Sequence, residues 1–525
     1  MSKVPADPAS AIGSESESSL PRHGDTFPLR LTAFEQLLVF DDDPACPMTS
    51  FIELHFATPL QVMILHDAFG QTVHRHPLLA STLVEKDGRL YWDYDPGFVP
   101  TLHDPADFPI LQAPVQSGVP AGKEAAGSPQ PSPRPIDLWK HPGCRYWYDV
   151  NPKTDKSRLT IQLHHAVCDG VGLRRVLIDV LAAYAKATDN RADSSDENAS
   201  QSTRRRVRRG EQLDVSRLCD RADYSSILSR EPKIQLTTWD RIKNAYYFHC
   251  QRPRPLKGSA ASRPEKHTGE VSESQATSDQ PLRHHIFSES VSQRLVDCCR
   301  RHEVGMNDLM LTVLFRVCRL WNRRHGADRS KTRIRLLMPV DLRSRADLNM
   351  PATNRLSFAF LGRTHGQCED WHDLLCSVQS ETQFIKDSRV HMDFVGGLDG
   401  FADHPNRLRR AIRYSGNMTT SVLTYTGDIS RGMKSHFPEV GGRRRIGDSY
   451  LENILIAPPA RRNTNITLGV CINWGQVCVS ANWNRGEFTQ QDTADFLRMF
   501  ADTTLEWLTR METESITDCQ AEAVV

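Results

Sequence analysis

Segments with strand-like and helix-like spacing of apolar residues alternate along the chain. Ser50–His55 and Arg158–Leu163 have the pattern of strands, whereas Gln61–His74 places its apolar residues on one helical face. Pro77 should end that helix near Arg75. Such alternation is typical of α/β and α+β folds, in which helices pack on sheets. No repeat of about 20–50 residues is visible, so a solenoid or a propeller is not supported.

The second half continues this pattern. Strands are expected at Thr332–Val340, Leu356–Leu361, Ile466–Ile472 and Gln476–Trp483. Helices are expected at Val291–Val304 with Leu295, Val296 and Cys299 inward, at Asp308–Trp321 with Asn307 as N-cap, and at Thr489–Leu508 capped by Thr489. Asp87-Gly88 and Asn473-Trp474-Gly475 each predict a hairpin turn.

Four stretches are too polar and too rich in Pro, Gly and Ser to pack a core: 1–28, 112–136, 186–213 and 253–282. The rest of the 525 residues suffices for two domains of roughly 200 residues each. Arg204–Arg209 forms a basic run inside the third stretch, which favours a solvated linker over a nuclear signal or a polyanion-binding patch.

Charge and cysteine content exclude several classes of protein. Lys and Arg number 65 and Asp and Glu 64, a net charge of +1, which argues against a nucleic-acid-coating protein. No apolar stretch approaches the roughly 18 residues of a transmembrane helix, and the N-terminus lacks the apolar segment of a secretory signal. The 13 cysteines have no metal-site spacing. We therefore expect reduced thiols and a cytoplasmic protein.

One short segment carries recognisable chemistry. Leu163-His164-His165-Ala166-Val167-Cys168-Asp169-Gly170 follows a predicted strand and precedes a helical pattern. Histidine has a pKa near neutrality, so it suits the removal of a proton from an attacking alcohol or amine. Adjacent histidines on a strand point to opposite faces and do not readily share one metal ion. We therefore expect no metal site here.

The pattern H-H-x-x-x-D-G resembles the signature of the thioester-dependent acyltransferase superfamily. That superfamily includes chloramphenicol acetyltransferase, plant alcohol acyltransferases, wax ester/diacylglycerol acyltransferases and the condensation domains of peptide synthetases. Five further segments resemble it in family order, namely Phe27–Phe34, Arg75–Leu79, Val304–Leu314, Pro339–Arg343 and Ser421–Asp428. The resemblance spans about residues 27–508.

The resemblance implies an α/β fold (α+β, two-layer) of two chloramphenicol-acetyltransferase-like lobes. Each lobe would be a mixed sheet flanked by helices, with the active-site channel between them. The first lobe would span 29–235, with insertions at about 112–136 and 186–213, and the second 283–515. An interlobe linker would occupy 236–282, and tails 1–28 and 516–525.

The resemblance also assigns roles at the motif. His165 would be the general base, and His164 a structural residue. Asp169 would turn away from the substrate and pair with Arg343 across the lobes; the alternative is an ordinary N-cap of the following helix. Gly170 would supply backbone freedom in a tight loop. Gly172 would serve close packing.

Other residues depart from the family pattern or invite a second interpretation. Tyr425 replaces the family asparagine in the second-lobe segment, so Thr424 or a backbone N–H would have to stabilise the oxyanion. Cys168 is expected to be a buried thiol. His284-His285 lacks a following D-G and is not expected to act. The clusters Arg443–Arg445 and Arg461-Arg462 fit a solvated loop, or the binding of CoA phosphates or an acidic carrier protein.

The first functional hypothesis is an acyltransferase that moves an acyl group from a CoA thioester to a hydroxyl or amine of a small molecule. The second is a condensation-type enzyme that uses a phosphopantetheine thioester on an acyl carrier protein in trans. The third is a catalytically silent relative that binds a ligand or a protein. We expect a monomer with no permanently bound cofactor, no metal and no nucleic-acid partner.

Overall fold

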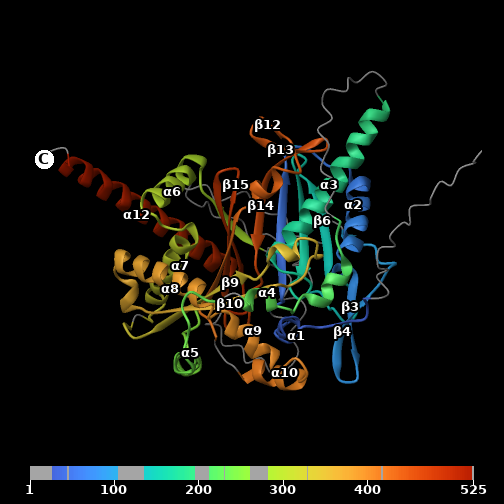
Figure 1. Cartoon of the computed structure of the whole chain (residues 1–525). Helices are drawn as coiled ribbons and strands as arrows, with labels where there is room; N and C mark the ends of the chain where they lie inside the picture. Colours follow the sequence, from blue (N-terminus) through green and yellow to red (C-terminus); the bar gives the residue numbers. More distant parts are fainter. Residues whose placement is uncertain are drawn as a thin grey trace, which may run out of the picture.

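Two large β-sheets stand side by side in the middle of the molecule, and helices cover their outer faces (Figure 1). The computed structural model describes residues 26–43, 46–103, 135–195, 212–229, 231–259, 282–327, 329–414 and 418–522. This arrangement agrees with the expected α/β fold of two mixed sheets flanked by helices.

Among the described residues the first sheet has seven strands, in the order β12-β13-β14-β2-β7-β6-β5. Their bounds are β2 Thr49–Phe56, β5 Leu102–His103, β6 Cys144–Val150, β7 Ser157–His164, β12 Glu439–Val440, β13 Arg443–Ile446 and β14 Ser449–Ala457. Helices α2 (Val62–Arg75) and α3 (Gly170–Ser195) lie together on one face (Figure 1). Ile52, Leu54 and Phe56 alternate along β2 and are buried in the core with these helices.

A small sheet of order β1-β4-β3 adjoins this lobe. Its strands are β1 Leu29–Arg30, β3 Ser81–Lys86 and β4 Arg89–Tyr94. The predicted hairpin at Asp87-Gly88 is confirmed, because both residues have positive φ, at 52° and 71°. That conformation is the one that two-residue hairpin turns require.

The second sheet, as far as the chain is described, has the order β10-β9-β11-β15-β16-β8. Its bounds are β8 Arg283–Ile286, β9 Arg333–Asp341, β10 Leu356–Thr364, β11 Ser421–Asp428, β15 Ile466–Asn473 and β16 Gln476–Trp483. The helices of this half are α6 Glu289–Arg301, α7 Met306–Arg324, α8 Trp371–Ser388, α9 Met392–Asp399, α10 Pro405–Tyr414, α11 Ile429–Met433 and α12 Gln490–Glu522. In this sheet β11 runs parallel to β9 and β15, and the other pairs are antiparallel.

The chain returns to the first sheet late in its sequence. β14 pairs with β2 in an antiparallel ladder that joins Ile454 to Leu54 and Ile456 to Ile52. Segment 439–457, which the sequence analysis assigns to the second lobe, therefore completes the sheet of the first. The exchange links the two lobes by main-chain hydrogen bonds.

Three short helices precede the second half, namely α1 Ala33–Phe40, α4 Ser225–Leu228 and α5 Thr238–Cys250. Helix α1 packs across to the other lobe, since the ring of Phe34 lies 5.1 Å from Phe358 and 6.5 Å from Phe394. Helix α5 lies inside the expected linker 236–282 and has a complete capping box between Thr237 and Asp240. The sequence analysis expects only a linker there, whereas the structure forms a helix that buries none of its side chains.

Helix α3 also differs from its expected end. It continues to Ser195, although a polar stretch is expected from residue 186. Once a buried face has nucleated a helix, each further residue adds one backbone hydrogen bond at small entropic cost. The remaining parts of the polar stretches, at 1–25, 112–134, 196–211 and 260–281, lie outside the described residues, as does Arg204–Arg209.

Two details of the second half correct the sequence expectation. Helix α7 starts at Met306 with Gly305 as N-cap, so Asn307 lies in the first turn instead of capping it. The Asn307 amide instead contacts the sulfur of Met338 at 3.3 Å. In α6, Leu295 and Cys299 are buried as expected, whereas Val296 is only half-buried. None of the helices in the described part of the chain combines the length and apolar character that crossing a membrane requires.

Candidate active site

The site begins where β7 ends. His164 is the last residue of β7 and is paired with Thr49 of β2. His165 starts the turn that leads into α3, and its backbone N–H donates to Met48 O at 2.8 Å. Because β7 lies between β2 and β6, its end is held on both sides. The sheet therefore fixes the place at which His165 leaves it.

The imidazole of His165 is oriented by its own turn. Nδ1 lies 3.1 Å from Cys168 O, and a carbonyl oxygen only accepts, so Nδ1 carries the hydrogen in this contact. Nε2 is then the unprotonated nitrogen and has a lone pair to offer. Burial lowers the pKa of His165, with Asp169 acting in the opposite direction. The ring is thus neutral at pH 7 and suited to accept a proton.

His164 makes only contacts within the protein. Its Nδ1 accepts from the backbone N–H of Ala166 at 3.2 Å. Its Nε2 lies 3.5 Å from Asp42 Oδ2, and the side chain is buried. Nδ1 therefore contacts the turn, and Nε2 contacts the segment that follows α1. This placement is the one that the sequence analysis assigns to His164.

Asp169 binds four donors from two parts of the chain. Arg343 donates to both of its carboxylate oxygens at 2.9 Å. The N–H of Gly172 donates to Oδ1 at 2.9 Å, as in an N-cap, and the N–H of Arg355 to Oδ2 at 2.8 Å. The two interpretations of Asp169, interlobe ion pair and helix cap, thus describe one side chain that does both.

The segment 350–355 of the second half holds the same turn, and sequence reasoning missed it. The Asn354 amide donates to His165 O at 2.9 Å and to Ala166 O at 2.7 Å. Its hydrogen bonds therefore fix the backbone on both sides of the peptide that follows His165. The only sequence signal is a polar Asn-Arg pair directly before the apolar strand Leu356–Thr364.

His76 ties the same segment to the first lobe. Its Nδ1 accepts from the N–H of Ala352 at 2.9 Å, and its Nε2 lies 3.1 Å from Asp179 Oδ2. Burial lowers the pKa of His76. Arg175 donates to Met350 O at 2.7 Å. Two contacts, one from the residue that follows α2 and one from α3, thus position the segment that in turn positions His165.

The surroundings of Gly170 and of Gly172, the two glycines at the motif, differ. A Cβ on Gly172 would lie 3.1 Å from Thr353 O and 3.2 Å from Thr353 N, which bears out the expected close packing. Gly170 has no positive φ, and a Cβ there would meet nothing within 4 Å. The expected need for backbone freedom at Gly170 is therefore wrong for this conformation, because Gly170 already begins α3 in helical geometry.

The oxyanion candidate lies on another strand. Thr424 is half-buried on β11, paired with Gly469 of β15. Burial raises the pKa of the neighbouring Tyr425 to about 12, so its phenol stays protonated and keeps its hydrogen as a donor. The role of Thr424 stays a prediction.

The alternative reactive groups are engaged elsewhere. Cys168 is buried, and burial raises the pKa of its thiol well above the usual range, which disfavours a nucleophilic thiolate. The arginine clusters pair with carboxylates, in the ion pairs Arg443–Glu452, Arg444–Glu439, Arg445–Asp189, Arg461–Asp41 and Arg462–Asp43. Within the described residues no group of three His, Cys, Asp or Glu side chains is arranged to hold a metal ion.

Comparisons with known proteins were made at the level of sequence and of structure. No protein-family model matches the chain, and no curated protein matches it in sequence. Among solved structures, it resembles the first condensation domain of the CDA synthetase, with 14% identity and a TM-score of 0.55 over 90% of this chain and 95% of that one.

Two further solved structures have the same arrangement. TRI3 trichothecene 15-O-acetyltransferase from Fusarium sporotrichioides has 10% identity and a TM-score of 0.56, over 91% of this chain and 94% of that one. The starter condensation domain of rhizomide synthetase RzmA, solved with C8-CoA and Leu-SNAC, has 13% identity and a TM-score of 0.51, over 91% and 93%. The chain therefore has the two-lobed fold that condensation domains share with chloramphenicol-acetyltransferase-like acyltransferases.

Proposed function

We propose that the protein is an acyltransferase that moves an acyl group from a CoA thioester to a hydroxyl or amine of a small molecule, with His165 as general base. The observation that carries the proposal is the hydrogen bond from His165 Nδ1 to Cys168 O, which leaves Nε2 as the basic nitrogen. The lowered pKa of His165 keeps that nitrogen unprotonated at pH 7.

The reaction needs one proton to move twice. His165 Nε2 takes the proton of the acceptor O–H or N–H as that atom attacks the thioester carbonyl carbon. The tetrahedral intermediate then collapses, the C–S bond breaks, and the thiolate leaves. The imidazolium returns its proton to the sulfur, so the enzyme ends unchanged. Thr424 or a backbone N–H stabilises the oxyanion in this proposal.

His164, Asp169, Gly170 and Arg343 belong to the site as structural residues. Asp169 and Arg343 act through the turn, because their bidentate ion pair and the hydrogen bonds of Asn354 fix the peptide that carries His165. A base held in one orientation loses less entropy at the moment of proton transfer.

The co-substrate in this proposal is acyl-CoA, bound transiently, with no permanent cofactor. One neighbour in fold was solved with C8-CoA and Leu-SNAC, and another is named as an O-acetyltransferase. The first supports a thioester donor, and the second supports a hydroxyl acceptor. The alternative donor, an acyl carrier protein, rests on the condensation-domain neighbours. The proposal also includes that the protein is a monomer and lies in the cytoplasm.

Thiol release tests the proposal. Wild-type protein is incubated with a panel of acyl-CoAs and pooled alcohols and amines, and free thiol is measured beside His165→Ala and the matched control His285→Ala. We expect acceptor-dependent release that collapses only in His165→Ala. Equal release from all three proteins would contradict the role of His165.

If none of the three proteins releases thiol, the same acyl groups are tested as thioesters of a carrier protein. Transfer from that donor would favour the condensation-type enzyme. Absence of transfer from both donors, with ligand binding retained, would favour the silent binding protein. Soaking with CoA thioesters separates the first two possibilities further.

A further inference from the structure

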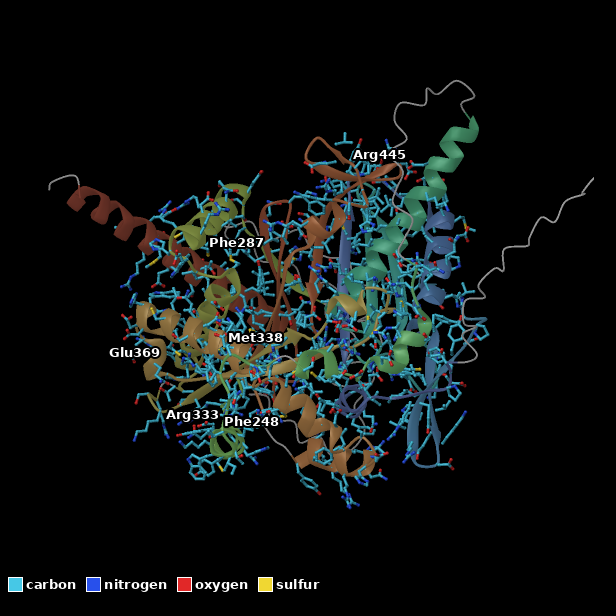
Figure 2. The ribbon with its side chains drawn as sticks, viewed as in Figure 1. Phe248, Phe287, Arg333, Met338, Glu369 and Arg445 are labelled. Carbon is cyan, nitrogen blue, oxygen red and sulfur yellow. The ribbon has the colours of Figure 1, made fainter. Side chains whose placement is uncertain are left out.

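A cavity of about 750 Å³ lies between α5, β10 and the α9–α10 pair. This volume falls within the roughly 300–1,000 Å³ of pockets that bury small-molecule ligands. Phenylalanine rings from four elements line it, namely Phe248, Phe358, Phe360, Phe384 and Phe394. Phe248 and Arg333, both labelled in Figure 2, line the cavity.

The phenylalanine rings form a connected wall. The ring of Phe360 lies 4.7 Å from Phe248 and 5.8 Å from Phe394, and Phe358 lies 5.1 Å from Phe394. Rings at these separations pack as they do in a protein core. The cavity opens to solvent and exposes part of this core-like wall, so a bound apolar group would remove that surface from water.

The charged groups of the wall are largely compensated within the protein. Arg335 donates to the last carbonyls of α5, with Gln251 O at 2.7 Å and Phe248 O at 3.0 Å. Arg363 pairs with Glu381, and Arg241 pairs with Asp393. These groups hold the wall together, and the surface that remains for a ligand is mainly apolar.

Helix α5 leaves apolar surface for such a ligand. None of its side chains is buried, and Phe248 is only half-buried. An apolar group in the cavity would cover Phe248 and remove its ring from water. Transfer of apolar surface out of water is the main favourable term in small-molecule binding.

One corner of the cavity is linked to the candidate active site by a short series of contacts. Arg461 lines this corner. Arg461 is paired with Asp41, and the next residue, Asp42, faces His164. Leu37 of α1 lines the cavity and lies in the same short helix that precedes this pair.

We propose that this cavity binds an apolar hydrocarbon group of a substrate and so determines which substrates react. This inference rests on the proposed acyl transfer at His165. The hydrocarbon group has two sources in that reaction, the acyl chain of the donor or the body of a hydrophobic acceptor. The chemistry that the cavity recognises is the same for both.

Two adjacent glycines of α9 provide a matched pair of variants. Gly397 lines the cavity and Gly396 does not, and a Cβ added to either would meet nothing within 4 Å. Both lie in the same helix without positive φ, so leucine fits the backbone at each. Gly362→Val is a second filling variant, since Gly362 lines the cavity from β10 with the same open space.

The test measures binding, so that it does not depend on turnover. Calorimetric titrations compare S-octyl-CoA with S-ethyl-CoA for the donor arm, and 1-octanol with ethanol for the acceptor arm. Neither thioether can transfer an acyl group. Each buried methylene contributes about fourfold in affinity, so we expect the longer member of one pair to bind at least about tenfold more tightly.

Gly397→Leu and Gly362→Val should reduce that preference to below about threefold, while Gly396→Leu keeps it. A preference in the CoA pair assigns the cavity to the acyl chain, and a preference in the alcohol pair assigns it to the acceptor. No chain-length preference in either pair, or an equal loss in Gly396→Leu, would overturn the proposal. His165→Ala should retain the preference, so a failure of the proposed chemistry would be recognised separately.

Discussion

Two pairs of adjacent histidines differ in where their strands end. His164-His165 stands at the end of β7, so that His165 already belongs to a turn. His284-His285 lies inside β8, with both residues paired to β16, opposite Ser480 and Val479. The ring of His285 packs against Phe287 at 4.7 Å, and burial lowers the pKa of both histidines, that of His284 to about 4.

Two adjacent histidines therefore do not by themselves indicate a catalytic site. Hydrogen bonds to β16 and the contact between His285 and Phe287 hold His284-His285 within the second sheet. At β7 the ladder stops, and Asp169 with Asn354 takes over the positioning of the next peptide. The histidine that follows the strand end is therefore held by the turn and by Asn354 instead of by the ladder.

The largest effect is expected from His165→Ala. Loss of a general base reduces the rate by about 10²- to 10⁴-fold, and kcat/KM for thiol release should fall within that range. His285→Ala should stay within about threefold of wild type, because its ring packs against Phe287 instead of reaching the turn. Comparable losses in the two variants would remove the distinction between the pairs.

A large effect on stability is expected from Asp169→Asn. The substitution removes the charge that two nitrogens of Arg343 bind, and breaking a buried ion pair costs about 3 kcal/mol in the free energy of unfolding. Asp403→Asn is the control, because its ion pair with Arg30 is exposed and should cost less than about 1 kcal/mol. Urea denaturation of both variants measures the difference, and equal costs would contradict the structural role of Asp169.

A smaller effect on rate is expected from Asn354→Ala. The variant removes both hydrogen bonds to the backbone after His165, so the base is held less well, and kcat should fall about tenfold with KM unchanged. Asn307→Ala is a matched control, since that amide contacts Met338 and not the turn. A rise in KM without a change in kcat would show that Asn354 serves binding instead.

The smallest effect is expected on the pH dependence of the free energy of unfolding, through His284 of the second histidine pair. Burial lowers the pKa of His284 to about 4, with Glu53 acting in the opposite direction, so protonation favours the unfolded state, in which the pKa is about 6.5. The contribution to stability is complete above pH 6.5 and is lost as pH falls toward 4, and amounts to at most about 3 kcal/mol. His284→Gln should lose less stability than wild type between pH 7 and 5. Identical pH curves from denaturant unfolding would refute the assignment.

Local patterns predicted the elements around the site well. Strand β7 and its turn were expected because apolar alternation stops at His164 and Asp169-Gly170 follows. The alternation reports which face of each strand is buried, and that is a local property. By contrast α5 was not expected, although Trp239, Ile242 and Tyr246 recur at helical spacing, because the segment leads into a stretch rich in Pro, Gly and Ser.

Long-range partners were accessible only through the resemblance or not at all. Arg343 was expected opposite Asp169 from its family position, while Asn354 was not expected to reach His165 O. A hydrogen bond between residues nearly 190 positions apart has no periodicity to reveal it. The pairing of β14 with β2 was missed for the same reason.

The sequence by itself determined the strands and helices next to the motif and the end of β7, because each depends on residues within a few positions of one another. The tertiary structure decided the rest. It brought segment 350–355 onto the turn, placed β12–β14 in the first sheet, and formed the cavity beside α5. These features arise from packing and hydrogen bonding between segments that are distant in the sequence, so no local pattern of residues specifies them.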